Sequence, residues 1–315
     1  MYNGTEFEFI LLGFPGFQDK ESKSILTAFF FSAYILILLE NFFIVIVIVA
    51  DENLHKPMYV FICNLALVDV LITTIVIPKT LANLMFNLNT ISFSACFVQT
   101  FAFLHGTTAQ LHILAAMCYD RVIAVCNPLQ YVTVMSNKLV ITLLVLCWTV
   151  ALVTPLVLLY FALQLSFCGP NKIPNYYCGH AALIKMSCTD YSINSVLGLV
   201  FGLGLLILHA IIFIISYGKI IVTVLKIKSA DGHMKAFSTC GAHLFVVITT
   251  LLSAAFVYVS SRVPAFSMDA RLMVATVQNL LCPVINPIIY SLMTKEIIES
   301  IKKVIQKNII KHFQE

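Results

Sequence analysis

The chain has 315 residues, of which 60% are apolar and 11% are charged, and its formal net charge is +4 at pH 7. Soluble domains are about half apolar and about a quarter charged, so this composition excludes a soluble globule and predicts a protein that crosses the membrane several times. The modest net charge gives no indication of nucleic acid binding, and we expect no nucleic acid partner.

The N-terminal segment, residues 1–23, is polar and acidic, and it carries the sequon Asn3-Gly4-Thr5. It shows no cleavable signal peptide, so we expect the first apolar stretch to act as the insertion signal. A sequon is glycosylated only where its segment is translocated, which predicts a glycan on Asn3 with the N-terminus outside the cell. Chance is the alternative, because such triplets are common.

Seven apolar stretches follow, each close to the roughly 20 residues that a helix needs to cross the hydrocarbon core. Backbone groups in lipid must bond within the protein, and the stretches lack the alternating polar positions of a β-barrel, so we expect helices. The expected spans are residues 24–50, 57–85, 95–125, 138–161, 192–225, 234–259 and 271–292. The prediction is therefore an all-α membrane protein whose seven-transmembrane-helix bundle forms one domain, residues 24–292.

An odd number of spans places the two termini on opposite sides of the membrane. Twelve of the 19 Lys and Arg residues lie on the side of the C-terminus, so the positive-inside rule places that side in the cytoplasm. In the cytoplasmic tail, residues 293–315, Ile297, Ile301 and Ile305 recur at helical spacing with lysines between them. This pattern predicts a short amphipathic eighth helix on the membrane lipids, with a frayed tail as the alternative.

Charged side chains inside the spans indicate functional sites, because lipid does not tolerate them without partners. Asp69 lies in the middle of the second span, and Glu40 lies in the first span beside Asn41. The pair Asp120-Arg121 near the end of the third span is typical of a switch held by electrostatics. A protonated core carboxyl is the alternative for Asp69, and a solvated ion pair of little energy is the alternative for Asp120-Arg121.

Five motifs resemble those of one family. Residues 117–131 match M-x-Y-D-R-x-x-A-x-C-x-P-L-x-Y, residues 235–243 are close to K-A-x-S-T-C-x-S-H, residues 286–290 read N-P-x-x-Y, and residues 57–59 read P-M-Y. On these motifs nearly the whole chain resembles the olfactory receptors, a branch of the rhodopsin-like (class A) G-protein-coupled receptors. Residues 11–16 read L-x-G-x-P-G and are similar to the segment before helix 1 in the fish-like (class I) olfactory receptors.

The resemblance implies a receptor of the plasma membrane, with an extracellular N-terminus, that binds a small odorant in the outer half of the bundle. It implies a heterotrimeric G protein of the stimulatory, olfactory type as the partner, a rise in cyclic AMP, and arrestin as a further partner. It implies no catalytic activity. We expect the sixth helix to move on activation and to open a cytoplasmic cleft for the G protein.

The resemblance also implies a switch in the cytoplasmic half of the bundle. Its residues are Asp120, Arg121, Tyr217, His243, Asn286, Pro287 and Tyr290. In class A receptors the counterparts of Asn41, Asp69 and Asn286 form a polar core that often binds sodium, and Gln110 takes the place of a third donor. Many olfactory receptors carry glutamate at that place, so Gln110 removes a charge there. Glu40 either supplies the missing acid or faces water.

Four cysteines are expected on the outer side, Cys96 at the start of the third span and Cys168, Cys178 and Cys188 between the fourth and the fifth. Four cysteines allow three sets of two disulfides, and the residues alone do not choose among them. The resemblance implies Cys96–Cys178, which ties the third helix to the second outer loop, and Cys168–Cys188 inside that loop.

Counting along the helices from Arg121 and Tyr217 nominates a ligand site by resemblance. The site is mostly apolar, as small-molecule pockets are, although ordinary helix packing explains each residue equally well. The residues are Phe103, Leu104, Thr107, Thr108, Phe201, Leu205, Leu251, Ala255, Tyr258 and Arg262. The Arg262 guanidinium could bind a carboxylate with two hydrogen bonds, or it could extend to the lipid headgroups instead.

Three other functions stay open from the residues. A transporter or channel would need a polar pathway, and Asp69, Glu40 and Gln110 offer a short one. A membrane hydrolase would need a nucleophile with its base, and the histidines in the spans have no paired acid motif. A class A receptor for amines would carry an aspartate near Phe103, and this chain has none there.

Overall fold

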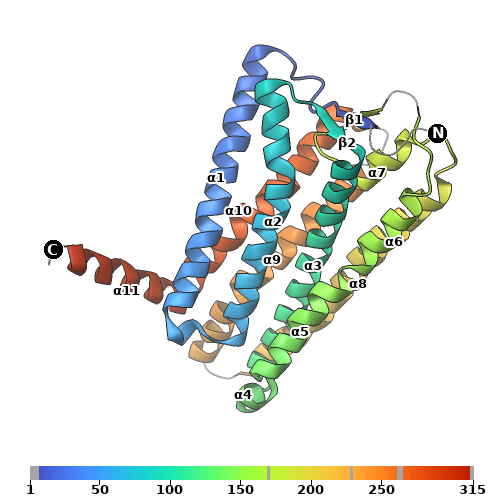
Figure 1. Ribbon diagram of the computed structural model, residues 1–315. Coiled ribbons are helices and arrows are strands. Elements are labelled where there is room, and N and C mark those ends of the chain that lie inside the picture. The colour runs from blue at the N-terminus through green and yellow to red at the C-terminus, as the bar shows by residue number, and fades with distance from the viewer. Residues whose placement is uncertain (1–6, 169–170, 228–229, 261–264, 313–315) are drawn as a thin grey trace.

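The computed structural model describes residues 7–168, 171–227, 230–260 and 265–312, with side chains for all of these except 230–239 and 304–312. Within these ranges seven helical spans are long and apolar enough to cross a membrane, which confirms the predicted fold class. They are α1 (Lys20–Ala50), α2 (Pro57–Phe86), α3 (Phe93–Cys126), α5 (Asn137–Val150) continued by α6 (Val153–Ala162), α8 (Ser192–Leu225), α9 (Ala230–Ser260) and α10 (Met268–Met293) (Figure 1). The spans lie side by side as one bundle.

The two ends of the bundle carry different short elements. We call one the sheet end, because strands β1 (Glu8–Leu11), β2 (Thr90–Ser92) and β3 (Lys172–Ile173) lie there. The other, the α11 end, carries three short helices and the C-terminal helix, which runs away from the bundle in Figure 1. These elements are η1 (Glu52–Leu54), η2 (Pro128–Gln130), α4 (Tyr131–Val134) and α11 (Lys295–His312).

Polar caps set where several spans begin. The Asp19 carboxylate accepts a hydrogen bond from the Ser22 backbone N–H at 2.8 Å, so α1 begins at Lys20 rather than at the predicted residue 24. Ser92, Ser136 and Ser267 cap α3, α5 and α10 in the same way. Such caps satisfy one of the free N–H groups of a first helical turn, which apolar composition does not reveal.

The fourth span is not the single helix that we predicted for residues 138–161. It is interrupted by a turn at Ala151 and Leu152 between α5 and α6. Pro155 explains the break, because its ring has no N–H for the carbonyl of Ala151 four residues earlier and displaces that carbonyl. The fourth span is confirmed, with this turn inside it.

The small sheet was not predicted. β1 lies in the middle, antiparallel to β2 with Phe9 opposite Ile91, and parallel to β3 with Leu11 opposite Ile173. Its apolar side packs into an aromatic cluster, in which the rings of Phe9 and Phe93 stack 6.0 Å apart. The sheet therefore joins the N-terminal segment to the loops after α2 and after α6.

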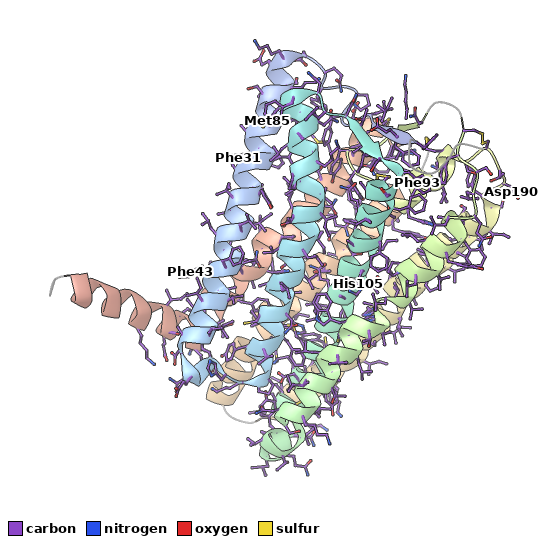
Figure 2. All side chains as sticks on the ribbon, viewed as in Figure 1. Phe31, Phe43, Met85, Phe93, His105 and Asp190 are labelled. Atoms are coloured by element: carbon purple, nitrogen blue, oxygen red, sulfur yellow. A yellow bond between two sulfur atoms is a disulfide. The ribbon has the colours of Figure 1, made fainter. Side chains whose placement is uncertain are left out.

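The outward faces of the spans are apolar. Figure 2 shows Phe31 and Phe43 pointing away from the bundle on α1, where they are 54% and 44% exposed. Exposed aromatic side chains on a long apolar helix are suited to lipid. At the α11 end, Ile297 of α11 is fully buried and Lys303 lies 3.8 Å from the Asp51 carboxylate, so these contacts hold α11 against the bundle.

Candidate functional site

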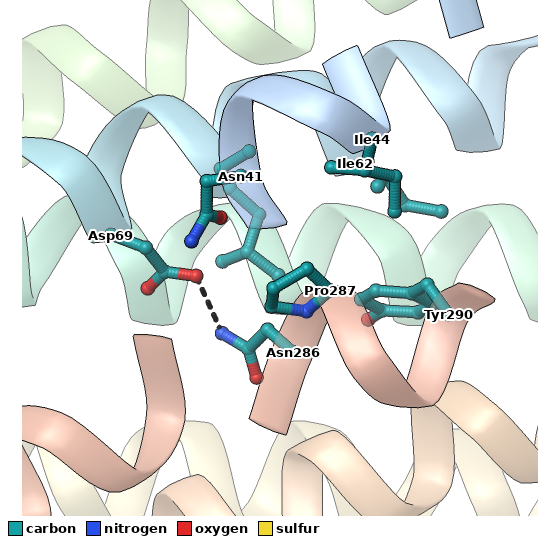
Figure 3. A pocket seen from close by; sticks show the side chains of 9 residues that line it. Asn41, Ile44, Ile62, Asp69, Asn286, Pro287 and Tyr290 are labelled. Atoms are coloured by element: carbon teal, nitrogen blue, oxygen red, sulfur yellow. Dashed lines mark hydrogen bonds between the residues drawn. The ribbon is translucent and has the colours of Figure 1, made fainter. Parts of the chain in front are cut away.

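A polar core joins three helices near the middle of the bundle. Asp69 of α2 is fully buried, and its two carboxylate oxygens each accept one hydrogen bond. Gln110 of α3 donates to Oδ1 through Nε2 at 2.8 Å, and Asn286 of α10 donates to Oδ2 through Nδ2 at 2.8 Å (Figure 3). A buried carboxylate needs such donors because burial without them costs several kcal/mol.

Asn41 belongs to the same core through a different bond. Pro287 has no N–H, so the Pro283 carbonyl four residues earlier lacks its normal partner within α10. The Asn41 amide of α1 donates to that carbonyl at 3.1 Å and also to Ile37 of its own helix at 2.9 Å. The kinked part of α10 is thereby tied to α1 as well as to α2.

The residues around Asp69 include further buried oxygen atoms. Both carboxylate oxygens of Asp69 accept from amide N–H groups, while the amide oxygens of Asn41 and Asn286 have no hydrogen-bond partner among the described residues. The space between Asn41, Asp69, Asn286 and Tyr290 in Figure 3 leaves no room for a water molecule. Glu40 is not among the residues that line this space. The sodium site stays a prediction.

The Asp120–Arg121 pair lies at the α11 end of α3. The Arg121 guanidinium donates to Asp120 Oδ2, with Nε at 3.0 Å, and both side chains are buried. The Tyr131 hydroxyl of α4 donates to the other oxygen, Oδ1, at 2.8 Å. Burial and the Asp120 carboxylate raise the pKa of Tyr131, so its hydroxyl keeps the proton that it donates. Asp120 and Arg121 therefore form a buried pair with Tyr131 as a third partner, and not the solvated surface ion pair that was the alternative.

A second polar link at the α11 end joins α8 to α9. The Tyr217 hydroxyl lies 2.7 Å from His243 Nδ1, and both side chains are buried. Tyr290 is also buried, and its hydroxyl has no hydrogen-bond partner among the described residues. Tyr217 therefore bonds to α9 in this structure rather than to Tyr290 of α10.

A small cavity lies on the sheet-end side of the polar core. Its volume is about 20 Å³, which is enough for one water molecule. The lining comes from α2, α3, α9 and α10 and consists of Ile72, Thr107, Gln110, Thr250, Gln278, Asn279, Cys282 and Pro283. Gln110 lines this cavity and also holds Asp69, so it connects the cavity to the polar core.

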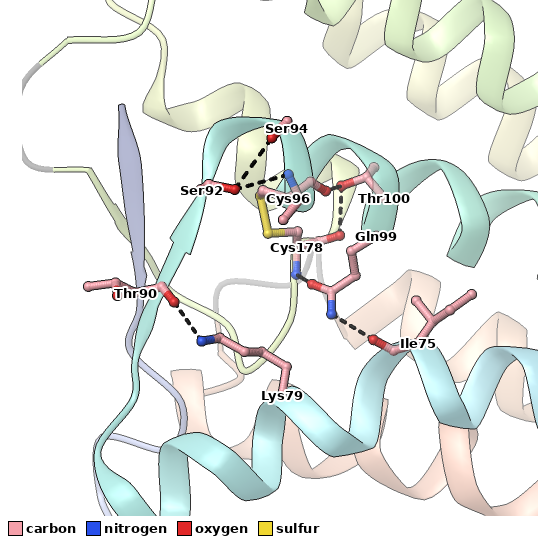
Figure 4. The surroundings of a disulfide bond; sticks show 10 residues. Ile75, Lys79, Thr90, Ser92, Ser94, Cys96, Gln99, Thr100 and Cys178 are labelled. Carbon is pink, nitrogen blue, oxygen red and sulfur yellow. Dashed lines mark hydrogen bonds between the residues drawn. A yellow bond between two sulfur atoms is a disulfide. The ribbon is translucent and has the colours of Figure 1, made fainter. Parts of the chain in front are cut away.

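The loop between α6 and α8 closes the sheet end over this cavity. One disulfide, Cys96–Cys178, ties it to α3, and the other, Cys168–Cys188, lies within it, with Cα–Cα distances of 5.4 and 5.8 Å. The Gln99 side chain accepts from the Cys178 N–H at 2.8 Å, and the Thr100 hydroxyl donates to the Cys178 carbonyl at 2.9 Å (Figure 4). Both backbone groups of Cys178, its N–H and its carbonyl, are therefore bonded to α3 in addition to the disulfide.

The same loop inserts two tyrosines toward the cavity. Tyr176 is fully buried, stacks on Phe14 at 5.2 Å, and its hydroxyl accepts from the Asn279 amide at 2.9 Å. Tyr177 packs against Phe103 of α3 at 4.9 Å. Because Asn279 lines the cavity, the loop contacts the wall of the cavity directly.

His180 lies in the short helix α7 (His180–Leu183) of this loop. Its burial makes the stability of the folded protein depend on pH. Burial lowers the pKa of His180 to about 4, against about 6.5 in an unfolded chain. The unfolded chain binds the proton more readily, so stability is complete above pH 6.5 and falls as the pH drops toward 4, by on the order of 3 kcal/mol. We expect the melting temperature of the purified protein to fall over this window. A His180→Asn variant should show a flatter profile, and an identical slope in both proteins would contradict the assignment.

Comparison with known proteins identifies the family. A family model described as olfactory receptor matches residues 30–308. The chain belongs to the olfactory receptor family. Members of this family are class A G-protein-coupled receptors and not enzymes, which removes the hydrolase and the non-olfactory receptor from the alternatives.

Individual olfactory receptors match this receptor over nearly its full length. Olfactory receptor 2A12 of Homo sapiens is 37% identical over 300 residues, covering 95% of this chain and 96% of the relative. Olfactory receptor 5H19 of Mus musculus is 39% identical over 282 residues, covering 89% and 91%. A crystal structure of squid rhodopsin superposes with a TM-score of 0.73 at 16% identity, covering 90% of this chain and 81% of that one. The last match supports the fold alone.

The predicted ligand residues are not gathered around one cavity in the olfactory receptor. Thr107 lines the small cavity, Phe103 packs on Tyr177, and the Thr108 hydroxyl bonds to the Leu104 carbonyl of its own helix at 2.8 Å. Tyr258 donates toward the α8 backbone at Leu199, 3.3 Å away. Four other predicted ligand residues do not line the cavity: Phe201, Leu205, Leu251 and Ala255. The predicted ligand residue Arg262 lies outside the described residues, and so does the predicted glycosylation site Asn3.

The α9 and α10 side of the cavity was not predicted from the sequence. Gln278, Asn279 and Cys282 precede the N-P-x-x-Y motif by one to two turns, and Thr250 follows His243 by two turns. Two neighbouring amides inside an apolar span are a signal that could have found this side, because amides in lipid need partners.

Proposed function

We propose that this olfactory receptor binds a small odorant in the outer half of the bundle, where it would reach the small cavity between α2, α3, α9 and α10, and that it activates a stimulatory, olfactory-type G protein, which raises cyclic AMP. The observation that carries the proposal is that Gln110 lines the cavity and bonds to Asp69 at 2.8 Å. A ligand that moves Gln110 therefore changes the bonds that join α2, α3 and α10. A ligand activates a receptor by binding the active conformation more tightly than the inactive one. A ligand contact with Gln110 would give that difference in affinity, because the Gln110–Asp69 bond would differ between the two conformations.

The signal must then travel to the α11 end. Thr107 precedes Arg121 by 14 residues, about 21 Å along the helix at 1.5 Å per residue. Over that distance we propose a rigid movement of α9, which breaks the Tyr217–His243 bond and exposes Arg121 to the G protein. Arrestin would enter the same cleft, and α11 would lie on the membrane lipids.

Placement in the cell belongs to the same proposal. The excess of lysines and arginines on the side of the C-terminus supports a plasma-membrane receptor with the sheet end outside the cell and the α11 end in the cytoplasm. Disulfides at the sheet end agree with an oxidising compartment. The fish-like subtype rests on residues 11–16, and the glycan rests on Asn3. Both stay predictions.

A cyclic AMP reporter assay tests the proposed function. Cells expressing the receptor should respond to at least one member of a panel of alcohols, aldehydes, acids and amines, and an Arg121→Ala variant at the same surface level should not. Silence of the receptor across the panel, with normal surface expression, would count against an odorant role.

The carboxylate-binding role of Arg262 is a finer prediction about the ligand. An Arg262→Ala variant should lose its responses to acids and keep those to neutral odorants, measured in the same reporter assay. Unchanged acid responses would remove the carboxylate idea and leave Arg262 as a residue that extends to the headgroups.

A further inference from the structure

We infer that His112 of α3 and His209 of α8 are positioning residues that keep the receptor inactive in the absence of odorant, because they fasten α8 to α3. The Tyr217–His243 bond joins α9 to α8. It can restrain α9 only if α8 is itself held in place. This inference rests on the proposed function and adds a second bond to the restraint that activation must release.

The two imidazole rings form a hydrogen bond inside the bundle. His112 Nδ1 lies 3.0 Å from His209 Nε2, and the ring centroids are 5.0 Å apart. His209 is 1% exposed and His112 is partly buried. Separating two such groups is costly, because each would then lie in an apolar span without a partner. The pair therefore resists movement of α8 away from α3.

The hydrogens of the pair have one arrangement when both rings are neutral, as an apolar span favours. His209 Nδ1 lies 2.7 Å from the Leu205 carbonyl of its own helix, and a carbonyl oxygen only accepts, so Nδ1 carries the hydrogen of His209. His209 Nε2 is then an acceptor, and His112 Nδ1 donates to it. A residue that replaces His112 must therefore donate from the same position to keep the bond.

The pair holds α8 close to the residue that bonds to α9. Between Asn194 and His209 no residue of α8 is buried, so the sheet-end half of this helix is loosely packed. From His209 toward the α11 end, buried residues recur along one face, and they are His209, Phe213, Tyr217, Ile220 and Val224. Tyr217 follows His209 by eight residues, about 12 Å along the helix at 1.5 Å per residue. Fixing His209 therefore fixes the position of Tyr217.

A second contact between α3 and α8 is weaker. Cys126 Sγ lies 3.2 Å from the Thr223 hydroxyl oxygen near the α11 end. Thr223 donates its own hydrogen to the Lys219 carbonyl at 2.9 Å, so the thiol must be the donor, and a thiol donates weakly. The His112–His209 bond is therefore the stronger of these two attachments.

The two hydrogen bonds act in series between α9 and α3. His243 of α9 bonds to Tyr217 of α8 at 2.7 Å, and His209 of α8 bonds to His112 of α3 at 3.0 Å. If the bond to α3 is lost, α8 and α9 can move together while the Tyr217–His243 bond stays intact. Opening then no longer breaks that bond, so the open conformation costs less free energy.

Basal cyclic AMP, normalised to the receptor at the cell surface, is the first test. His112→Leu should raise it about three- to tenfold, as the loss of one buried hydrogen bond predicts. His112→Asn places an amide N–H where the ring carries Nδ1–H, so it should keep basal activity low. The control is Cys126→Ala, which removes only the weak thiol contact and should change basal activity by less than about twofold.

A double variant tests the series arrangement. His112→Leu combined with His243→Leu should raise basal activity no further than the stronger of the two single variants, because either change alone releases α9. If His112→Leu does not reach the cell surface, His209→Leu takes its place, since it removes the acceptor of the same bond.

Two spin-label distances test the same arrangement without a G protein, in a receptor whose free cysteines are replaced. Labels at Thr142 of α5, which packs against α3, and at Val222 of α8 report the separation of α8 from α3. Labels at Val222 and at Lys235 of α9 report the separation of α9 from α8. His112→Leu should add a population with a longer first distance and leave the second unchanged, and His243→Leu should do the reverse.

The outcomes distinguish the inference from the proposed function. A longer separation of α8 from α3 in His112→Leu without a rise in cyclic AMP would support the attachment and contradict the coupling to a stimulatory G protein. An unchanged separation, basal activity in His112→Asn as high as in His112→Leu, or an additive rise in the double variant would overturn the attachment and leave the receptor function in place.

Discussion

Replacing Asp69 by alanine should abolish the odorant response and destabilise the receptor by about 3–5 kcal/mol. The reason is that Asp69 is fully buried and accepts bonds from Gln110 and Asn286, and its removal leaves two buried amides without an acceptor. Each hydrogen bond to a charged group contributes about 1.5–3 kcal/mol, and orphaned partners add their desolvation cost. The melting temperature of the purified receptor and its cyclic AMP response measure the two effects.

The control for Asp69→Ala is Thr73→Val, one turn further along α2. It removes a buried polar group whose bond stays within its own helix, so it should cost about 1 kcal/mol or less. Asp69→Asn should fall between the two, because its amide oxygen would still accept one hydrogen bond while its amide nitrogen would face another N–H donor. If Asp69→Ala responded to odorants like the unmodified receptor, the polar core would not couple α2, α3 and α10.

Replacing His243 by leucine should raise the activity of the receptor in the absence of odorant. His243 bonds to Tyr217 at 2.7 Å and joins α9 to α8 at the α11 end. Removing a buried hydrogen bond of about 1–1.5 kcal/mol shifts a two-state equilibrium roughly tenfold toward the conformation that does not need it. Basal cyclic AMP, normalised to the receptor at the cell surface, measures this shift.

The control for His243→Leu is Thr249→Val, at a partly buried position of the same helix. Its hydroxyl bonds only within α9, at the Phe245 and Val246 carbonyls, so basal activity should not change. Lower basal activity in His243→Leu with normal surface expression would mean that the Tyr217–His243 bond supports the active conformation instead.

The sequence predicted the spans and the residue types of the polar core well, for a physical reason. A span is defined by apolar length, which composition measures directly, and a carboxylate such as Asp69 inside it needs partners that must also lie inside the bundle. Asn286 and Gln110 are those partners. The sodium site stays a prediction, because composition does not reveal which oxygens and N–H groups face Asp69.

The features that sequence reasoning missed depend on contacts between distant segments. β1 pairs with β2 and with β3, but the three strands have only two to four residues each, which is too short for a periodic signal. Tyr217 meets His243 because α8 and α9 pack against each other, and neither residue alone reveals that contact. Gln278 and Asn279 were visible as polar residues in a span, but their cavity appears only once α10 is packed against α3.

The movement of α9 is the step on which the proposed function depends most. Paired spin labels at Thr142 on α5 and Lys235 on α9, in a variant whose free cysteines are replaced, would report the separation of the two helices at the α11 end in lipid nanodiscs. An activating odorant with the stimulatory G protein should shift the distance distribution toward larger separations, and His243→Leu should show part of that shift without odorant. An unchanged distribution under conditions that raise cyclic AMP would contradict the opening of α9.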